Sequence, residues 1–173
     1  MVYLSNAQNI NIPDTSFLYS LIDKGVDTNG DSIISFSEAE EITYLDVSWK
    51  NISSLIGIES FKNLNTLTCN NNQLTSLDVS ACNVITELHC NFNKLTGLDV
   101  SDNLSLVYLD CSENQITNLD VTKNTALKYL NCMANVITSL DFSKNIDLDA
   151  LLCDHNYLNS LDVSGCTKLT SLS

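Results

Sequence analysis

The residues best suited to chemistry in this chain of 173 residues are oxygen donors that recur along one short segment. They are Asp27, Asn29, Asp31, Ile33, Ser35 and Glu38. Calcium takes six to eight oxygen ligands from carboxylates, amides, backbone carbonyls and water. The spacing therefore predicts a calcium site in which Ile33 offers its backbone carbonyl, Ser35 acts through a water and Glu38 contributes both carboxylate oxygens.

The segment 27–38 resembles the EF-hand calcium loop over all of its twelve places. It departs from that loop at the sixth place, where a glycine normally provides a positive φ and this chain has Ser32. The strain costs on the order of 1 kcal/mol. The other interpretation is a polar turn between two short helices, with Ser37 and Glu40 forming a capping box. Bound calcium would be a structural cofactor of modest affinity.

Seven cysteines raise the alternatives of disulfides, zinc or a nucleophile. Zinc is disfavoured because no Cys-x-x-Cys pair occurs, and adjacent parallel strands give poor disulfide geometry. Cys82 and Cys166 are four coils apart, about 19 Å at the spacing of strands, and cannot pair. We therefore expect the thiols to behave as small buried apolar groups. The other five recur every 21 residues: Cys69, Cys90, Cys111, Cys132 and Cys153.

The period of 21 residues also governs asparagine and leucine columns, and in-phase columns indicate a solenoid of stacked repeats. Apolar and polar residues alternate in 66–69, which predicts a short strand with one buried face. Stacked coils about 4.8 Å apart would supply the core. The asparagines should bond backbone groups of their own and neighbouring coils. They are Asn72, Asn93, Asn114, Asn135 and Asn156.

The unit Leu-x-x-Leu-x-Cys-x-x-Asn-x-Leu, followed by Thr-x-Leu-Asp-Val-Ser, resembles the leucine-rich repeat in its short bacterial internalin-like or BspA-like form. The resemblance covers residues 42–173, with Lys50 in the place of the first ladder asparagine. It implies an α/β fold: a right-handed leucine-rich-repeat solenoid with a parallel sheet on one face and short extended or turn segments on the other. It also implies a bacterial secreted or cell-surface protein, although the chain shows no signal peptide.

Residues 1–41 do not repeat and should form a small helical N-terminal cap on the first coil. Pro13 and Asp14 mark the start of a helix, and Gly25 marks its end. The last strand should leave an open edge, which either continues into a longer protein or associates end to end with another chain; we favour the longer protein. The expected repeats are 42–63, 64–84, 85–105, 106–126, 127–147, 148–168 and a partial 169–173.

Residues that flank each buried leucine should point outward on the strand face, where solenoids bind partners. Aromatic residues and methionine are favoured at interfaces, so we predict a partner-binding patch on this face. Tyr108 and Tyr129 should stack about 4.8 Å apart. The acidic residues nearby favour a basic partner. The predicted patch is His89, Phe92, Tyr108, Asp110, Tyr129, Met133 and Leu152.

A column of aspartates follows the second leucine of each repeat. In water, unit charges about 5 Å apart repel by about 0.8 kcal/mol. The fold tolerates this repulsion if each carboxylate accepts backbone N–H bonds in the following turn. The alternative is a stripe that binds cations. The column is Asp78, Asp99, Asp120, Asp141 and Asp162.

Charge and composition exclude several classes of function. The net charge of −13 disfavours nucleic acid and anionic membrane surfaces, and no apolar stretch is long enough for membrane insertion. His89 and His155 are about 15 Å apart at the spacing of strands, and no catalytic motif appears, so we predict that the chain is not an enzyme. The favoured function is a protein-interaction or adhesion module whose partner the sequence does not name. The alternative is a structural spacer in a larger cell-surface protein.

Overall fold

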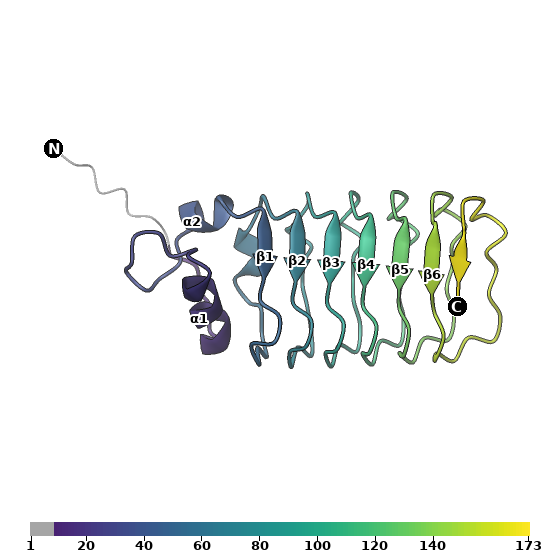
Figure 1. Cartoon of the computed structure of the whole chain (residues 1–173), viewed down its shortest axis with the longest axis horizontal. Helices are drawn as coiled ribbons and strands as arrows, with labels where there is room; N and C mark the ends of the chain where they lie inside the picture. Colours follow the sequence, from purple (N-terminus) through teal and green to yellow (C-terminus); the bar gives the residue numbers. More distant parts are fainter. Residues whose placement is uncertain (1–8) are drawn as a thin grey trace.

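The computed structural model describes residues 9–173, and it shows a slender stack of coils with a parallel sheet along one face (Figure 1). The strands lie side by side in chain order, and all six pairings are parallel. Each strand is only two or three residues long because the repeat is short. The strands are β1 (Tyr44–Asp46), β2 (Thr66–Thr68), β3 (Glu87–His89), β4 (Tyr108–Asp110), β5 (Tyr129–Asn131), β6 (Ala150–Leu152) and β7 (Ser171–Leu172).

The helices lie in the cap and the first coil. Helix α1 (Thr15–Asp23) is capped by Asp14, whose side chain accepts a hydrogen bond from the Phe17 N–H at 3.0 Å, and Gly25 follows it in the left-handed conformation. Helix α2 (Phe36–Glu40) leads into β1, and the short 3₁₀ helix η1 (Ile58–Ser60) lies on the back of the first coil. In the later coils of residues 9–173 the back contains turns and extended segments and no helix, which confirms the expected short extended or turn segments on that face.

One continuous core runs through the coils. The central leucine of each strand from β1 to β6 is buried, and so are all seven cysteines, which are free thiols. Burial raises the pKa of the Cys69 thiol to about 12 and that of Cys82 to about 11. The cysteines therefore pack as apolar residues, as the repeat predicts.

An asparagine ladder follows the strands and is saturated with hydrogen bonds. The Asn93 amide donates to the carbonyls of Cys69 and Cys90 at 3.1 and 3.0 Å, and its Oδ1 accepts from the Leu74 N–H at 3.0 Å. The same pattern recurs in the neighbouring coils, so each side chain joins its own coil to the preceding one. We call this set the front ladder: Asn72, Asn93, Asn114, Asn135 and Asn156.

A second set of asparagines lines the back of the core, and only their amide N–H groups make hydrogen bonds. The Asn124 amide donates to the carbonyls of Val100 and Asn103, each at 2.9 Å, but its buried Oδ1 has no hydrogen-bond partner in the protein. Cys82 and Cys166 hold the corresponding positions in their own coils. We call this set the back ladder: Asn103, Asn124 and Asn145.

Candidate functional site: the strand face and the cap

Three residues of the predicted patch form a stack of aromatic rings on the strand face. Tyr108 and Tyr129 are register partners in β4 and β5, and their ring centroids lie 4.2 Å apart with an interplanar angle of 1°. His89 of β3 packs on Tyr108 at 4.6 Å and 34°. The predicted stacking of the tyrosines is thus confirmed, because adjacent coils in strict register place like positions directly over each other.

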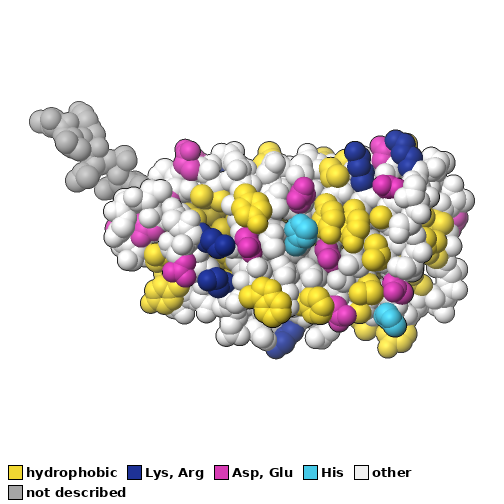
Figure 2. All heavy atoms as spheres, viewed as in Figure 1, with side chains coloured by type: hydrophobic (Ala, Val, Ile, Leu, Met, Phe, Trp, Pro, Cys, Tyr) yellow, Lys and Arg dark blue, Asp and Glu magenta, His cyan; other side chains and the backbone are white. Residues whose placement is uncertain are grey.

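Acidic groups surround this stack. Burial raises the pKa of the Tyr108 hydroxyl, the neighbouring Tyr129 raises it further, and the charges of Asp110 and Glu87 act in the same direction. Asp110 also accepts hydrogen bonds from the N–H and hydroxyl of Ser112, at 3.1 and 2.7 Å. Figure 2 shows hydrophobic and acidic side chains interspersed along the strand face. The face is therefore amphipathic, with aromatic surface next to negative charge.

The remaining residues of the predicted patch lie on and beyond the strands: Leu152 is in β6, in register with Asn131, and Asp110 is in β4. Met133 and Leu152 are partly exposed. Phe92 is 50% exposed, but it lies beyond the end of β3 and lines a hollow together with Trp49. Trp49 lies outside the predicted patch. The signal that could have included it is its position three residues beyond the end of β1, the same place that Phe92 has after β3.

The cap loop, residues 27–35, is held in its turn by hydrogen bonds from its own backbone N–H groups to its own side chains. Asp27 accepts hydrogen bonds from the N–H groups of Gly30 and Ser32 at 2.8 and 2.9 Å. Asn29 accepts from the Asp31 N–H, and Asp31 accepts from the Ile33 N–H, at 2.8 and 2.9 Å. These bonds fold the segment into a tight turn.

Ser32 has a φ of 64°, the left-handed conformation that the EF-hand comparison requires at the sixth place. A serine there carries the strain that a glycine would avoid.

Glu38 is turned into the cap and is 7% exposed. Its carboxylate accepts hydrogen bonds from the N–H and hydroxyl groups of both Ser35 and Thr28, at 2.8 to 3.0 Å. Burial alone raises the pKa of Glu38, but the bonds from Ser35 and then Thr28 outweigh it and lower the pKa to about 2. Ser35 and Glu38 form the capping box of α2, so the expected box of Ser37 and Glu40 is wrong by two residues.

Two of the six candidate calcium ligands, Ser35 and Glu38, are thus in contact with each other, whereas the side chains of Asp27, Asn29 and Asp31 face backbone N–H groups of the loop. Within residues 9–173, no three His, Cys, Asp or Glu side chains are arranged to hold a metal ion. The oxygen-rich loop fits calcium by its donor types. Glu38 would have to exchange its present hydrogen bonds before it could become a ligand.

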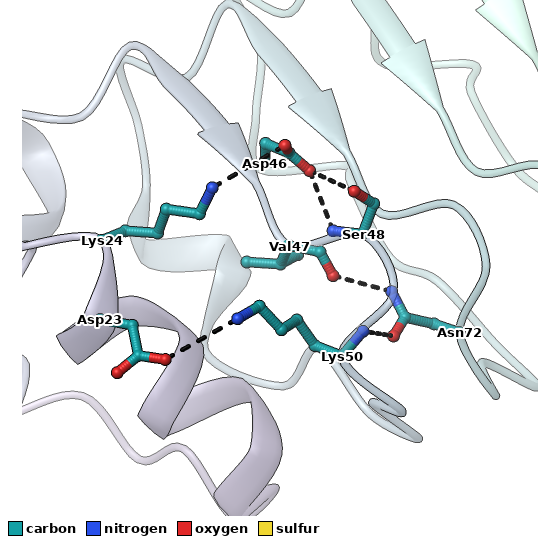
Figure 3. A network of polar contacts seen from close by, with 7 residues as sticks. All are labelled: Asp23, Lys24, Asp46, Val47, Ser48, Lys50 and Asn72. Atoms are coloured by element: carbon teal, nitrogen blue, oxygen red, sulfur yellow. Dashed lines mark hydrogen bonds and ion pairs between the residues drawn. The ribbon is translucent and has the colours of Figure 1, made fainter.

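The cap is joined to the repeats by charged residues (Figure 3). Lys50, which replaces the first ladder asparagine, pairs with Asp23 of α1 at 3.7 Å, and Lys24 pairs with Asp46 of β1 at 3.8 Å. Asp14 caps α1 with one oxygen and accepts from the Ser53 N–H at 2.8 Å with the other. The front ladder begins here, because Asn72 bonds Val47 and the backbone N–H of Lys50.

The aspartate column on the back is accounted for by local bonds. Each carboxylate accepts the N–H of the residue two places on, at 2.8 to 2.9 Å, as in the bond from Ser80 to Asp78. Hydrogen bonds from Ser80 lower the pKa of Asp78, and Asp99 raises it by a smaller amount. These bonds confirm the predicted means by which the column is tolerated. They give the cation stripe no support.

No protein-family model and no curated protein sequence matches the chain. Solved structures do. The functional domain of InlJ from Listeria monocytogenes, described as including a cysteine ladder, is 34% identical, with a TM-score of 0.83 over 97% of this chain. The internalin InlF from Listeria monocytogenes is 20% identical, with a TM-score of 0.71 over 97%. The Leptospira interrogans leucine-rich-repeat protein LIC12759 is 22% identical, with a TM-score of 0.72 over 78%.

These structures establish the fold as a leucine-rich-repeat solenoid of the internalin type. The chain spans 39% of the InlJ structure, 59% of InlF and 38% of LIC12759. Among residues 9–173, none of the helices has the length and apolar character needed to cross a bilayer.

Proposed function

We propose that the chain is a non-catalytic binding module that presents its strand face to a protein partner. The observation that carries this proposal is the stack of His89, Tyr108 and Tyr129, because rigid aromatic surface is what interface centres are made of. Asp110 and Glu87 beside the stack favour a basic partner. The likeness to internalin structures supports a bacterial secreted or cell-surface setting.

The test compares two double variants of the chain. Tyr108→Ala with Tyr129→Ala removes the ring pair, and the fold should tolerate it because Ala150 already holds the same position in β6. Tyr19→Ala with Tyr157→Ala removes two tyrosines outside the strands that are 65% and 67% exposed, as a control. A basic partner captured by the immobilised chain should bind the first variant at least tenfold more weakly and the control unchanged.

The alternative function, a spacer within a larger surface protein, predicts a different result. Both variants would then behave as the unmutated chain does, with no saturable binding to any protein. Equal binding by the ring-pair variant and the control would likewise reject the tyrosine pair as the contact surface.

A second proposal is that calcium binds the cap loop and stabilises it. Support comes from the left-handed Ser32 and from the alternating oxygens of Asp27, Asn29 and Asp31, which are the donors that calcium favours. Calorimetric titration with calcium should give saturable heat at millimolar concentration or below. Asp31→Asn should weaken that binding, and Asp102→Asn on the exposed back should leave it unchanged. No heat from the unmutated protein would refute the site.

A further inference from the structure

A hollow of about 370 Å³ opens where the chain leaves the first three strands. It is shallow and open to solvent, so a ligand would be held on the surface of the protein. Trp49 follows β1, Asn71 follows β2 and Phe92 follows β3, so three successive coils contribute to it. The lining consists of Trp49, Asn51, Asn71, Asn72, Gln73 and Phe92.

The backbone conformation explains why the side chain at this place in each coil projects outward. It does not explain why two of these side chains, Trp49 and Phe92, are aromatic. In each coil the residue at this place has a positive φ, including 60° at Trp49, 56° at Asn71 and 52° at Phe92. Asparagine suits the left-handed conformation, whereas large aromatic residues rarely adopt it. Trp49 is nevertheless 75% exposed and Phe92 50% exposed. The two rings therefore add strain and exposed apolar surface that the turn does not require.

The spacing of the coils sets how far apart the backbone positions of Trp49 and Phe92 lie. Trp49 and Phe92 are two coils apart, about 9.6 Å at the spacing of strands. A flat ring in contact with a face on each side needs about 7–8 Å, twice the optimal separation of two carbon atoms. A six-membered ring would therefore fit between two side chains that project in parallel from these positions, above Asn71 of the intervening coil.

The polar groups in the hollow are neutral amides. Asn72 is consumed by the front ladder, but the side chains of Asn51, Asn71 and Gln73 make no hydrogen bond to any part of residues 9–173. Each amide offers two donors and an acceptor. No charged side chain lines the hollow, although the chain has 21 acidic and 8 basic residues.

We propose that this hollow binds a neutral sugar ring of a glycan. The C–H face of a pyranose is weakly positive and packs on the negative face of an aromatic ring. Its hydroxyl groups both donate and accept hydrogen bonds, as the three amides of the hollow do. A ligand with a carboxylate or an ammonium group would find no opposite charge there. The site is separate from the tyrosine pair, so binding of a glycan and of a protein partner can succeed or fail independently.

Trp49 is the only tryptophan in the chain, so its fluorescence reports on this site alone. The protein is first screened against an array of neutral oligosaccharides. The glycan that binds best is then titrated into the protein while the fluorescence emission of Trp49 is recorded. The emission should change saturably. A sulfated oligosaccharide and a proline-rich peptide serve as comparison ligands, and both should bind at least tenfold more weakly.

The decisive variant is Phe92→Asn. It introduces an asparagine, the residue type that the preceding coil has at the same place in Asn71. It should retain or raise the melting temperature and weaken the glycan at least tenfold. Tyr157→Ala and the tyrosine-pair variant should bind the glycan normally. The proposal is overturned if no neutral glycan changes Trp49 emission at millimolar concentration, if Phe92→Asn binds normally, or if the peptide binds as tightly as the glycan.

Discussion

The repeats and the cap are stabilised by different polar groups. In the repeats, the buried polar side chains are mostly neutral amides, and each front-ladder asparagine joins two coils, as Asn93 joins Cys69 to Cys90. In the cap, carboxylates make the corresponding links: the buried Glu38 joins α2 to the loop, and the partly exposed Asp14 links α1 to the first coil. A stacked repeat must use the same group in every coil, and a column of buried charges would repel itself. The cap occurs once, so a charged group is tolerated there.

The largest expected effect is in the front ladder. Asn93→Ala would leave the Leu74 N–H without a partner inside the core, and a buried unsatisfied group costs about 1–3 kcal/mol. It would also remove one of the two amide donors to each of the Cys69 and Cys90 carbonyls, which keep those of the neighbouring ladder asparagines. We expect a loss of about 3 kcal/mol in the free energy of unfolding, measured by urea denaturation. The loss should be the same at pH 7 and pH 4, because an amide does not titrate there.

The matched control is Asn91→Ala, two residues earlier, whose partly exposed side chain makes no hydrogen bond to residues 9–173. It should change stability by less than about 0.5 kcal/mol. If the two alanine variants were equally stable, the ladder would not hold the coils together.

The next effect is in the cap and depends on pH. The pKa of Glu38 is about 2 in the folded protein, below its ordinary value of 4.5, so its contribution is present above pH 4.5 and is lost as the pH falls toward 2. Glu38→Gln should reduce stability by about 2 kcal/mol at pH 7, since hydrogen bonds to a charged group are worth about 1.5–3 kcal/mol each.

The deficit of Glu38→Gln should shrink steadily in melting curves recorded from pH 5 to pH 2.5. Glu40→Gln, an exposed change in the same helix, provides the control and should have little effect at any pH. A deficit that stays constant with pH would mean that the charge of Glu38 is not what stabilises the cap.

A smaller effect is expected in the back ladder. Asn124→Ala removes two hydrogen bonds but also removes a buried Oδ1 that has no partner in the protein, so we expect a loss of about 1–2 kcal/mol. Asn124→Cys should cost less than about 1 kcal/mol, because cysteine already serves at the same place in Cys82 and Cys166. Denaturation side by side with Asn93→Ala tests the order, and equal losses in the two ladders would contradict it.

The sequence was sufficient to predict the repeats because their constraint is periodic. A residue such as Leu88 or Cys90 recurs at the same place in every coil, so register, burial and the tyrosine stack follow from counting. The cap has no repeating sequence pattern from which its contacts could be predicted. The bonds of Glu38 depend on how one loop folds back on Ser35 and Thr28, and the sequence offered Ser37 and Glu40 as an equally good capping box. The hollow at Trp49 was missed because it lies off the strands, between side chains of separate coils.

The smallest effect is expected at the junction of the cap with the first coil, where surface ion pairs link the two parts. The pairs Lys50 with Asp23 and Lys24 with Asp46 are 3.7 and 3.8 Å long and largely solvated, and such pairs contribute about 0–1 kcal/mol. Lys50→Asn removes one of these pairs and supplies the asparagine that the ladder has elsewhere, so the melting temperature should change by no more than a few degrees. The difference from the unmutated chain should disappear at 1 M salt, where charges are screened over about 3 Å. A large loss that persists in salt would mean that the cap is held by its surface ion pairs, and that the contrast with the repeats rests on exposed charge instead of the buried carboxylate of Glu38.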